Sequence, residues 1–294
     1  LDGASRVLRC LLVIGEAGVG KSCLIGKFLE NSDKYLLLSA RGVEEGREIS
    51  LFPFHDLMKN LAAQIDLGKV APSFPERVKV VLGETFPALN LEVAFESTSF
   101  SRIGRMLAEL FRELRANGPI RLVLEDLQWF DDASLQVLEN FLGGDPGEIE
   151  ILMASRLDVS PKIVKTLKSF AGMGLIKYKM IYLKSFDMED VERFCRKGLG
   201  GRRLSPQIVE KLYEYSGGLP LYLKNYLSLI VQKKSIEDIP DNVKEAIERV
   251  LAGLGDKERR ILECMSVFLN EVNWDLLRNV CECTEEVLAE AVEL

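Results

Sequence analysis

The sequence has only one histidine, His55, in 294 residues. Ser-His-Asp and Cys-His catalytic groups need a histidine beside the nucleophile, and most zinc sites draw on several histidine and cysteine ligands. The sequence therefore argues against both classes. His55 follows Pro53 and Phe54, where a helix is expected to begin, so we interpret it as a surface or capping residue.

Cysteine is also sparse, and the six cysteines are scattered. Cys10 falls in an apolar run and Cys23 in an expected helix, which suits reduced thiols of a cytosolic protein. The pair Cys281 and Cys283 has the wrong spacing for a zinc knuckle and lacks a partner pair. We therefore expect a cytoplasmic location. The remaining cysteines are Cys195 and Cys264.

Long apolar runs are missing as well. No stretch reaches the roughly 18 uncharged apolar residues that a membrane-spanning helix needs, and no signal peptide is visible. We expect no membrane partner. The first residue is Leu1 rather than methionine, so we expect the natural N-terminus to lie outside this sequence.

Positive charge is in deficit, because 38 Lys and Arg face 45 Asp and Glu, for a net charge of −7. The protein as a whole has no basic field to hold nucleic acid, although a local basic face stays possible. With 47% hydrophobic and 28% charged residues, the composition is that of a globular protein, and the length suggests two or three domains.

A phosphate-binding pattern is present near the N-terminus. Residues 15–22 match G-x-x-x-x-G-K-[ST] between an apolar run and an expected helix, the context that supports a P-loop. Its glycines let the backbone curl around a polyphosphate. Lys21 would reach the terminal phosphates, and the Ser22 hydroxyl would bind Mg²⁺. The residues expected to contact nucleotide are Gly15, Glu16, Ala17, Gly18, Val19, Gly20, Lys21, Ser22 and Cys23.

Strand and helix patterns alternate up to about residue 183, and only helical patterns follow. Unbroken apolar runs separated by amphipathic segments predict an α/β fold with a parallel sheet. Strands are expected at 9–14, 35–39, 120–125, 149–155 and 178–183. Helices are expected at 55–67, 104–116, 133–142, 187–197, 206–216, 220–233, 241–252, 256–269, 273–281 and 284–294.

Hydrolysis also needs a carboxylate, which we expect on a strand neighbouring the P-loop strand. The run 120–124 is apolar apart from Arg121 and is followed by Glu125 and Asp126, the Walker B arrangement. We assign Glu125 to the Mg²⁺ shell and Asp126 to the attacking water, and keep the exchanged roles as an alternative. The strand 149–155 is expected beside the P-loop strand, which would bring Arg156 near the γ-phosphate.

Several phrases together resemble the STAND class of AAA+-related P-loop ATPases, as found in large bacterial and archaeal transcriptional regulators. They are residues 15–22, 122–134, 151–156 and 216–221. The resemblance implies a five-stranded parallel core of the AAA+/ASCE type at 1–183, a helical lid at 184–236 and a truncated winged helix at 237–294. It also implies that Pro220 packs near the adenine and that Arg156 senses the phosphate.

The resemblance implies an ATP- and Mg²⁺-dependent regulatory switch. Slow hydrolysis would reset it, ATP would permit self-association, and sensor or effector modules would be fused outside this chain. The sequence departs from the family pattern because its C-terminal region has no nucleotide-sensing histidine. We keep three alternatives: a DNA-handling ATPase like archaeal replication initiators, a GTPase or small-molecule kinase, and a scaffold that binds nucleotide without hydrolysis. The acidic helix expected at 284–294 disfavours DNA, and no guanine-reading motif appears.

Overall fold

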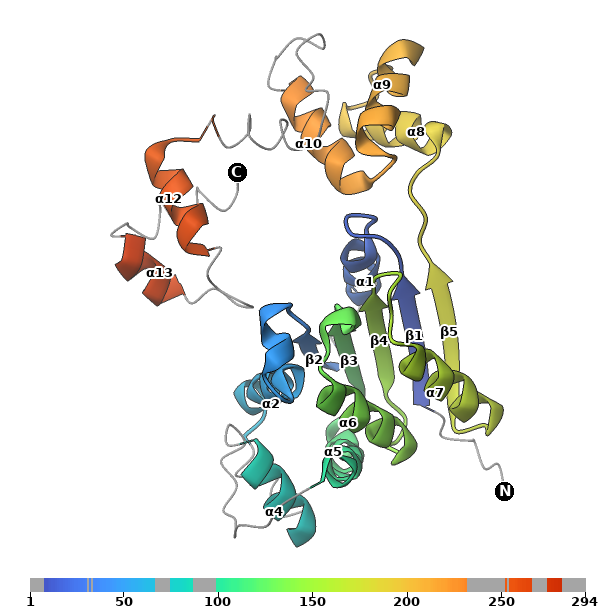
Figure 1. Cartoon of the computed structure of the whole chain (residues 1–294), viewed down its shortest axis with the longest axis vertical. Coiled ribbons are helices and arrows are strands. Elements are labelled where there is room, and N and C mark those ends of the chain that lie inside the picture. The colour runs from blue at the N-terminus through green and yellow to red at the C-terminus, as the bar shows by residue number, and fades with distance from the viewer. Residues whose placement is uncertain are drawn as a thin grey trace. The chain divides into compact units, whose positions relative to one another are not determined.

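The computed structural model describes residues 8–30, 32, 34–66, 75–86, 99–231, 252, 254–265 and 274–281. It divides into two compact units (Figure 1). The first comprises Leu1–Gly15 and Lys21–Leu183, and the second comprises Glu16–Gly20 and Lys184–Leu294. The tip of the phosphate loop thus groups with the second unit, although both of its flanks belong to the first.

The first unit is built on a five-stranded sheet in the order β2-β3-β4-β1-β5. All strand pairs are parallel, so the predicted five-stranded parallel α/β core is confirmed. The strand carrying Glu125 was expected next to the P-loop strand, and this was wrong, because β4 lies between them. The strands are β1 (Leu8–Ile14), β2 (Leu36–Arg41), β3 (Ile120–Glu125), β4 (Glu150–Ser155) and β5 (Ile176–Tyr182).

Burial explains why the inner strands β3 and β4 are mainly apolar. The first five residues of β3 and the last five of β4 are all buried, because helices cover both faces of the sheet. The main core joins one face to α2, α5, α6 and α7, while Ile25 and Leu29 of α1 pack on the other face. Figure 1 shows α1 behind the sheet and α6 and α7 in front of it.

The helices of the first unit begin where capping and proline chemistry allow. Ser99 accepts the N–H of Arg102 at 3.4 Å, so α5 starts four residues earlier than the expected 104. The helices are α1 (Lys21–Leu29), α2 (Phe52–Gln64), α4 (Glu76–Thr85), α5 (Phe100–Leu114), α6 (Asp132–Gly143) and α7 (Pro161–Gly172). Short 3-10 turns are η1 (Glu45–Glu48), η4 (Arg115–Asn117) and η5 (Leu127–Trp129).

His55 is an internal residue of α2, since that helix begins at Phe52 with Pro53 in its first turn. Its ring packs edge-on against Phe86 with 5.1 Å between centroids. His55 therefore does not cap α2, as one of the two interpretations had it, and its side chain is half-buried. Burial, and then the nearby Lys59, lower the pKa of this imidazole below its usual value of 6.5.

From Lys184 onward, the described secondary structure of the second unit is helical. Its core joins three helices through residues such as Val191, Leu212 and Tyr226. The described helices are α8 (Met188–Gly198), α9 (Pro206–Ser216), α10 (Pro220–Val231), α12 (Asp256–Met265) and α13 (Trp274–Cys281). The helix expected at 284–294, and nearly all of that at 241–252, lie outside the described residues.

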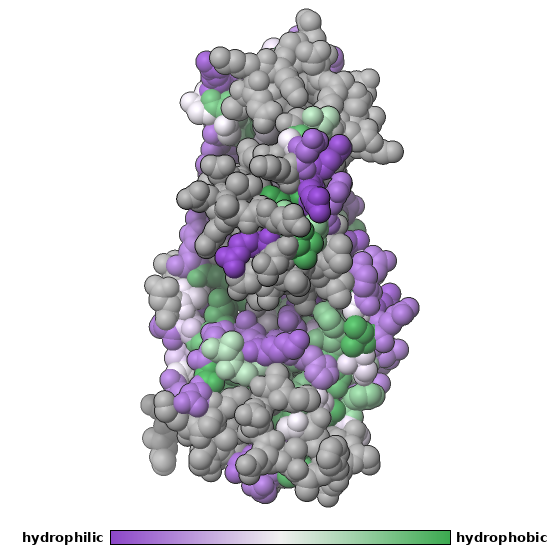
Figure 2. All heavy atoms as spheres, turned by 90° about the vertical axis from the view of Figure 1, so that its left-hand side faces the viewer, coloured by the Kyte–Doolittle hydropathy of each residue, from purple (hydrophilic) through white to green (hydrophobic). Residues whose placement is uncertain are grey.

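The described surface mixes polar and apolar side chains. Figure 2 shows hydrophilic and hydrophobic residues interspersed on the face that it presents. Among the described helices, none combines the length and the hydropathy required to cross a bilayer.

Candidate nucleotide site

The predicted site residues come from segments that follow the carboxyl ends of the strands. In a parallel sheet these ends share one edge, where ligands of open α/β folds bind. The P-loop follows β1, Asp126 follows β3 and Arg156 follows β4, while Arg41 ends β2. Figure 1 shows the arrowheads of the strands pointing to this edge.

The P-loop has the backbone conformation that its glycines were expected to permit. Gly18 and Gly20 have φ of 76° and 101°, values that residues with a Cβ rarely adopt. Gly15 has no positive φ and instead anchors the loop, because its N–H donates to the Ser155 carbonyl at 3.2 Å. The loop therefore stays attached to β4 beside it.

Lys21, the lysine of the pattern, is buried at the start of α1. Its ammonium donates to the Gly15 carbonyl at 2.9 Å. Burial lowers the pKa of Lys21, and the negative charge of Asp126 partly opposes that shift. Its charge is therefore poorly solvated and suited to a phosphate oxygen.

Ser22 and Glu125, the two predicted Mg²⁺ ligands, are in direct contact. The Ser22 hydroxyl, at the start of α1, donates to Oε2 of Glu125 at 2.5 Å. The contact forms even though β4 separates β3 from the P-loop strand β1. Mg²⁺ in phosphate sites takes one or two protein oxygens plus phosphate and water, and this pair fits that donor set. Within the described residues, no cluster of three or more His, Cys, Asp or Glu could form an all-protein metal cage.

Asp126 has an unusual backbone and two side-chain partners. Its φ of 54° lies in the left-handed region, which is uncommon for residues other than glycine. Its Oδ2 accepts from Nε of Arg41 at 2.8 Å, and its Oδ1 accepts from the amide of Gln128 at 2.9 Å. Neither Arg41 nor Gln128 was predicted from the sequence as a partner of Asp126. For Arg41, the position of a positive charge at the end of the apolar strand β2 could have indicated a role at this edge of the sheet.

Gly42 permits β2 and the turn after β3 to approach closely. Its N–H donates to the Glu125 carbonyl at 2.9 Å. A Cβ on Gly42 would stand 2.5 Å from the carbonyl oxygen of Asp126. The absence of a side chain here therefore sets the position of the two acids, and sequence reasoning did not identify this glycine.

Gln128 also contacts the end of β4. Its Oε1 accepts from the backbone N–H of Arg156 at 3.0 Å. The exposed Arg156 side chain places its guanidinium 5.4 Å from the centroid of the Trp129 ring, within cation–π range. Its positive charge acts to lower the pKa of Lys21. Its contact with a γ-phosphate stays a prediction.

Cys23 and Pro220 complete the predicted set. Cys23 is exposed in the first turn of α1. Pro220 begins α10, and the next residue, Leu221, donates its N–H to the Gly18 carbonyl at 3.2 Å within the second unit. That contact brings the start of α10 to the loop tip. The packing of Pro220 near an adenine stays a prediction.

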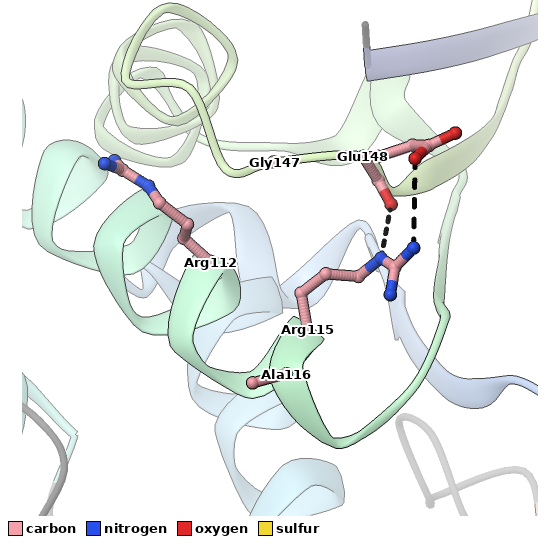
Figure 3. A pocket seen from close by; sticks show the side chains of 5 residues that line it. All are labelled: Arg112, Arg115, Ala116, Gly147 and Glu148. Carbon is pink, nitrogen blue, oxygen red and sulfur yellow. Dashed lines mark hydrogen bonds and ion pairs between the residues drawn. The ribbon is translucent and has the colours of Figure 1, made fainter. Parts of the chain in front are cut away.

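Two hollows in the first unit differ in their relation to this site. One of about 410 Å³ lies beside it and is lined partly by Gln128, Asp131 and Asp158. The other, of about 450 Å³, lies between α5 and the loop before β4 (Figure 3). Its Arg112 and Arg115 already donate to backbone carbonyls of that loop, so they tie the two segments together.

Comparison with known families identifies a domain in the N-terminal half of the chain. A family profile described as "AAA ATPase domain" matches residues 1–153. The chain belongs to the AAA ATPase domain family. The match covers more than half of the 294 residues and includes the P-loop, Glu125 and Asp126.

Solved structures are similar at low identity, and no curated protein sequence matches the chain. A RuvB variant of Thermotoga maritima has 14% identity and a TM-score of 0.40, over 96% of this chain and 77% of that chain. Aeropyrum pernix ORC2 has 13% identity and a TM-score of 0.44, over 98% of this chain and 79% of that chain. Aeropyrum pernix ORC1, solved in complex with DNA, has 11% identity and a TM-score of 0.46, over 97% of this chain and 76% of that chain. Similarity at this level carries no inference about function.

Proposed function

We propose that this AAA ATPase domain is a Mg²⁺-dependent ATP-hydrolysing switch of the STAND class, with slow turnover. The observation that carries the proposal is the contact of Ser22 with Glu125 at 2.5 Å, beside a buried Lys21 and an oriented Asp126. These groups are the ones that phosphoryl transfer to water requires.

Each residue has a distinct role in the proposed reaction. The loop N–H groups and Lys21 bind the phosphates and balance their charge. Ser22 and Glu125 would hold Mg²⁺, which supplies charge stabilisation to the terminal phosphates when bound. Asp126 accepts a hydrogen bond from the attacking water and orients it toward the γ-phosphorus. Arg156 would stabilise negative charge on the transferred group.

The proposed switch rests on the grouping of the phosphate-loop tip with the helical unit. The tip Glu16–Gly20 groups with the helical unit, and Gly18 accepts the Leu221 N–H. A ligand that binds this loop differently as ATP and as ADP would bias the conformation of the start of α10. We propose that the bound nucleotide controls the lid at 184–236 and a winged helix at 237–294. ATP would then permit self-association, with sensor or effector modules outside this chain.

The deciding experiment compares the parent with Lys21→Ala and Asp126→Asn. We expect ATP to be preferred over GTP, Lys21→Ala to lose nucleotide binding, and Asp126→Asn to bind ATP without turnover. Binding without hydrolysis by the parent would contradict the enzyme proposal and indicate a nucleotide-stabilised scaffold. Equal turnover in Asp126→Asn, with loss in Glu125→Gln, would exchange the two roles.

A basic face favours nucleic acid as a second candidate partner. Residues 159–183 contain no Asp, Glu or Arg. Their lysines are exposed on α7 and on the edge strand β5, and within the described part of the chain none has a carboxylate partner. Unpaired lysines are suited to a phosphate backbone. The lysines are Lys162, Lys165, Lys168, Lys177 and Lys179.

Fluorescence anisotropy with duplex DNA tests this candidate. Replacing two of the lysines, in Lys165→Glu with Lys177→Glu, should weaken binding and reduce the slope of log K against log salt by about two, because each phosphate contact contributes about 0.9. The matched control is Lys211→Glu on α9, which is exposed and lies in the other unit. Failure of the parent to bind at low salt would exclude the DNA-handling alternative.

A further inference from the structure

Gln128 lies in the turn η5 after the β3 acids, and only 7% of its surface is exposed. Its amide makes contacts in two directions. Nε2 donates to Oδ1 of Asp126 at 2.9 Å. Oε1 accepts from the N–H of Arg156 at 3.0 Å and from the hydroxyl of Ser155 at 3.3 Å. One buried side chain therefore connects the acid after β3 to the end of β4.

The chemistry of these partners determines the orientation of the amide. A backbone N–H only donates, so the amide oxygen has to face Arg156. A carboxylate only accepts, so the NH₂ group has to face Asp126. An ionised glutamate of the same length would lack the donor, and methionine would lack both groups. Position 128 therefore requires both the amide NH₂ donor and the amide oxygen acceptor of glutamine.

Asp126 depends on its surroundings for its geometry. Its left-handed backbone, with φ of 54°, is a conformation that persists when neighbours over-determine it. Gln128 holds one carboxylate oxygen and Arg41 holds the other, at 2.8 Å. Of the nearby charges, Arg41 from β2 pairs directly with this carboxylate, and Lys21 from α1 interacts with it electrostatically.

We propose that Gln128 is a positioning residue that holds the Asp126 carboxylate and the Arg156 backbone in one fixed relation for hydrolysis. The inference rests on the proposed ATPase activity. The acid that orients water and the arginine that would meet the phosphate are then positioned together, by a residue to which the proposed reaction assigns no contact with phosphate or metal.

The test uses Gln128→Met and Gln128→Glu in the whole chain, with Gln136→Met and Gln136→Glu as matched controls on the exposed face of α6. Both Gln128 variants should lower kcat on the order of tenfold to a hundredfold, a part of what a positioned acid or base contributes. KM and the affinity for ADP should change less than about threefold, because the residue does not contact phosphate. The controls should match the parent.

The dependence of kcat on pH distinguishes a positioning role of Gln128 from a role in packing alone. A protonated carboxyl can donate to Asp126 and still accept from Arg156. Gln128→Glu should therefore recover toward the parental kcat as the pH falls from about 8 to about 6, whereas Gln128→Met should keep a constant deficit. A parental kcat in Gln128→Met, or the same flat deficit in both variants, would overturn the proposal.

Thermal melting gives a readout that needs no turnover. Gln128→Glu should melt below the parent at about pH 8 and approach it at about pH 5.5, because two facing carboxylates repel until one binds a proton. If the parent hydrolyses no ATP, the proposed function fails, yet this pattern still decides whether the bridge exists. Should either variant fail to fold, Gln128→Asn keeps the amide but is too short to span both partners, so a parental kcat in Gln128→Asn would overturn the proposal.

Discussion

The guanidinium of Arg41 donates through Nε to Oδ2 of Asp126 at 2.8 Å, joining the ends of two adjacent strands. The Arg41 side chain is 62% exposed and that of Asp126 is 18% exposed. An exposed pair of this kind stabilises a protein by roughly 0.2–1 kcal/mol. A double-mutant cycle of Arg41→Met and Asp126→Asn in urea unfolding should return a coupling energy in that range. A coupling of zero in low salt would contradict a stabilising contribution from this pair.

Gly42→Ala should disturb the acids without removing them. Its Cβ would meet the Asp126 carbonyl oxygen at 2.5 Å, so the turn after β3 has to shift, at a cost of about 1–3 kcal/mol in unfolding free energy. Turnover should fall while ADP binding persists. Gly26→Ala in α1 is the control, because nothing lies within 4 Å of its Cβ, and it should be neutral or stabilising by about 0.5–1 kcal/mol. Equal changes in unfolding free energy and turnover for Gly42→Ala and Gly26→Ala would contradict the close contact between Gly42 and the Asp126 carbonyl.

Nucleotide should protect one thiol from alkylation. Cys23 is exposed directly after Ser22, so bound ATP or ADP should cover it. Burial raises the pKa of Cys10 to about 12 and that of Cys195 to about 11, so both should stay largely unreacted in the folded protein, since only the thiolate attacks. Peptide mass spectrometry after iodoacetamide, with and without Mg-ADP, measures this. Protection of Cys264 rather than Cys23 would place the nucleotide elsewhere.

Stability should fall as the solution becomes acidic because of His55. Its pKa is lowered in the folded protein, first by burial and then by Lys59. The unfolded chain therefore binds a proton more readily, and stability is lost as the pH falls from the unfolded value of about 6.5 toward the lower folded value. Urea unfolding across that window should show a shallower pH dependence in His55→Gln. An identical pH dependence in the variant would rule out the contribution of this imidazole.

The sequence was sufficient for features that depend on local pattern. The P-loop was predictable because its glycines and lysine have fixed spacing within one short segment. The sheet was predictable because strands buried on both faces are nearly continuous apolar runs. The order of the strands was harder to predict from sequence. β4 lies between β1 and β3 in the sheet, and this arrangement depends on contacts between residues far apart in the sequence.

The partners of Asp126 were hidden for the same reason. Arg41 lies 85 residues away from it in the sequence, and only the β2–β3 pairing brings them together. Gln128 was visible in the phrase that carries the family resemblance, yet its two-sided contact requires the end of β4, 28 residues further on. Gly42 gave no signal, because a lone glycine after a strand is ordinary. The helix start at Phe52 was misplaced because Pro53 was not interpreted as a first-turn residue.

The lysines of β5 have a consequence for how copies of this protein can associate. β5 is an edge strand, with Lys177 and Lys179 exposed at alternate positions. A charged edge resists the addition of another strand, because two such edges brought together repel and lose hydration. Copies are thereby discouraged from fusing their sheets at this edge. An assembly formed in the presence of ATP would then have to use surfaces other than this edge of the sheet.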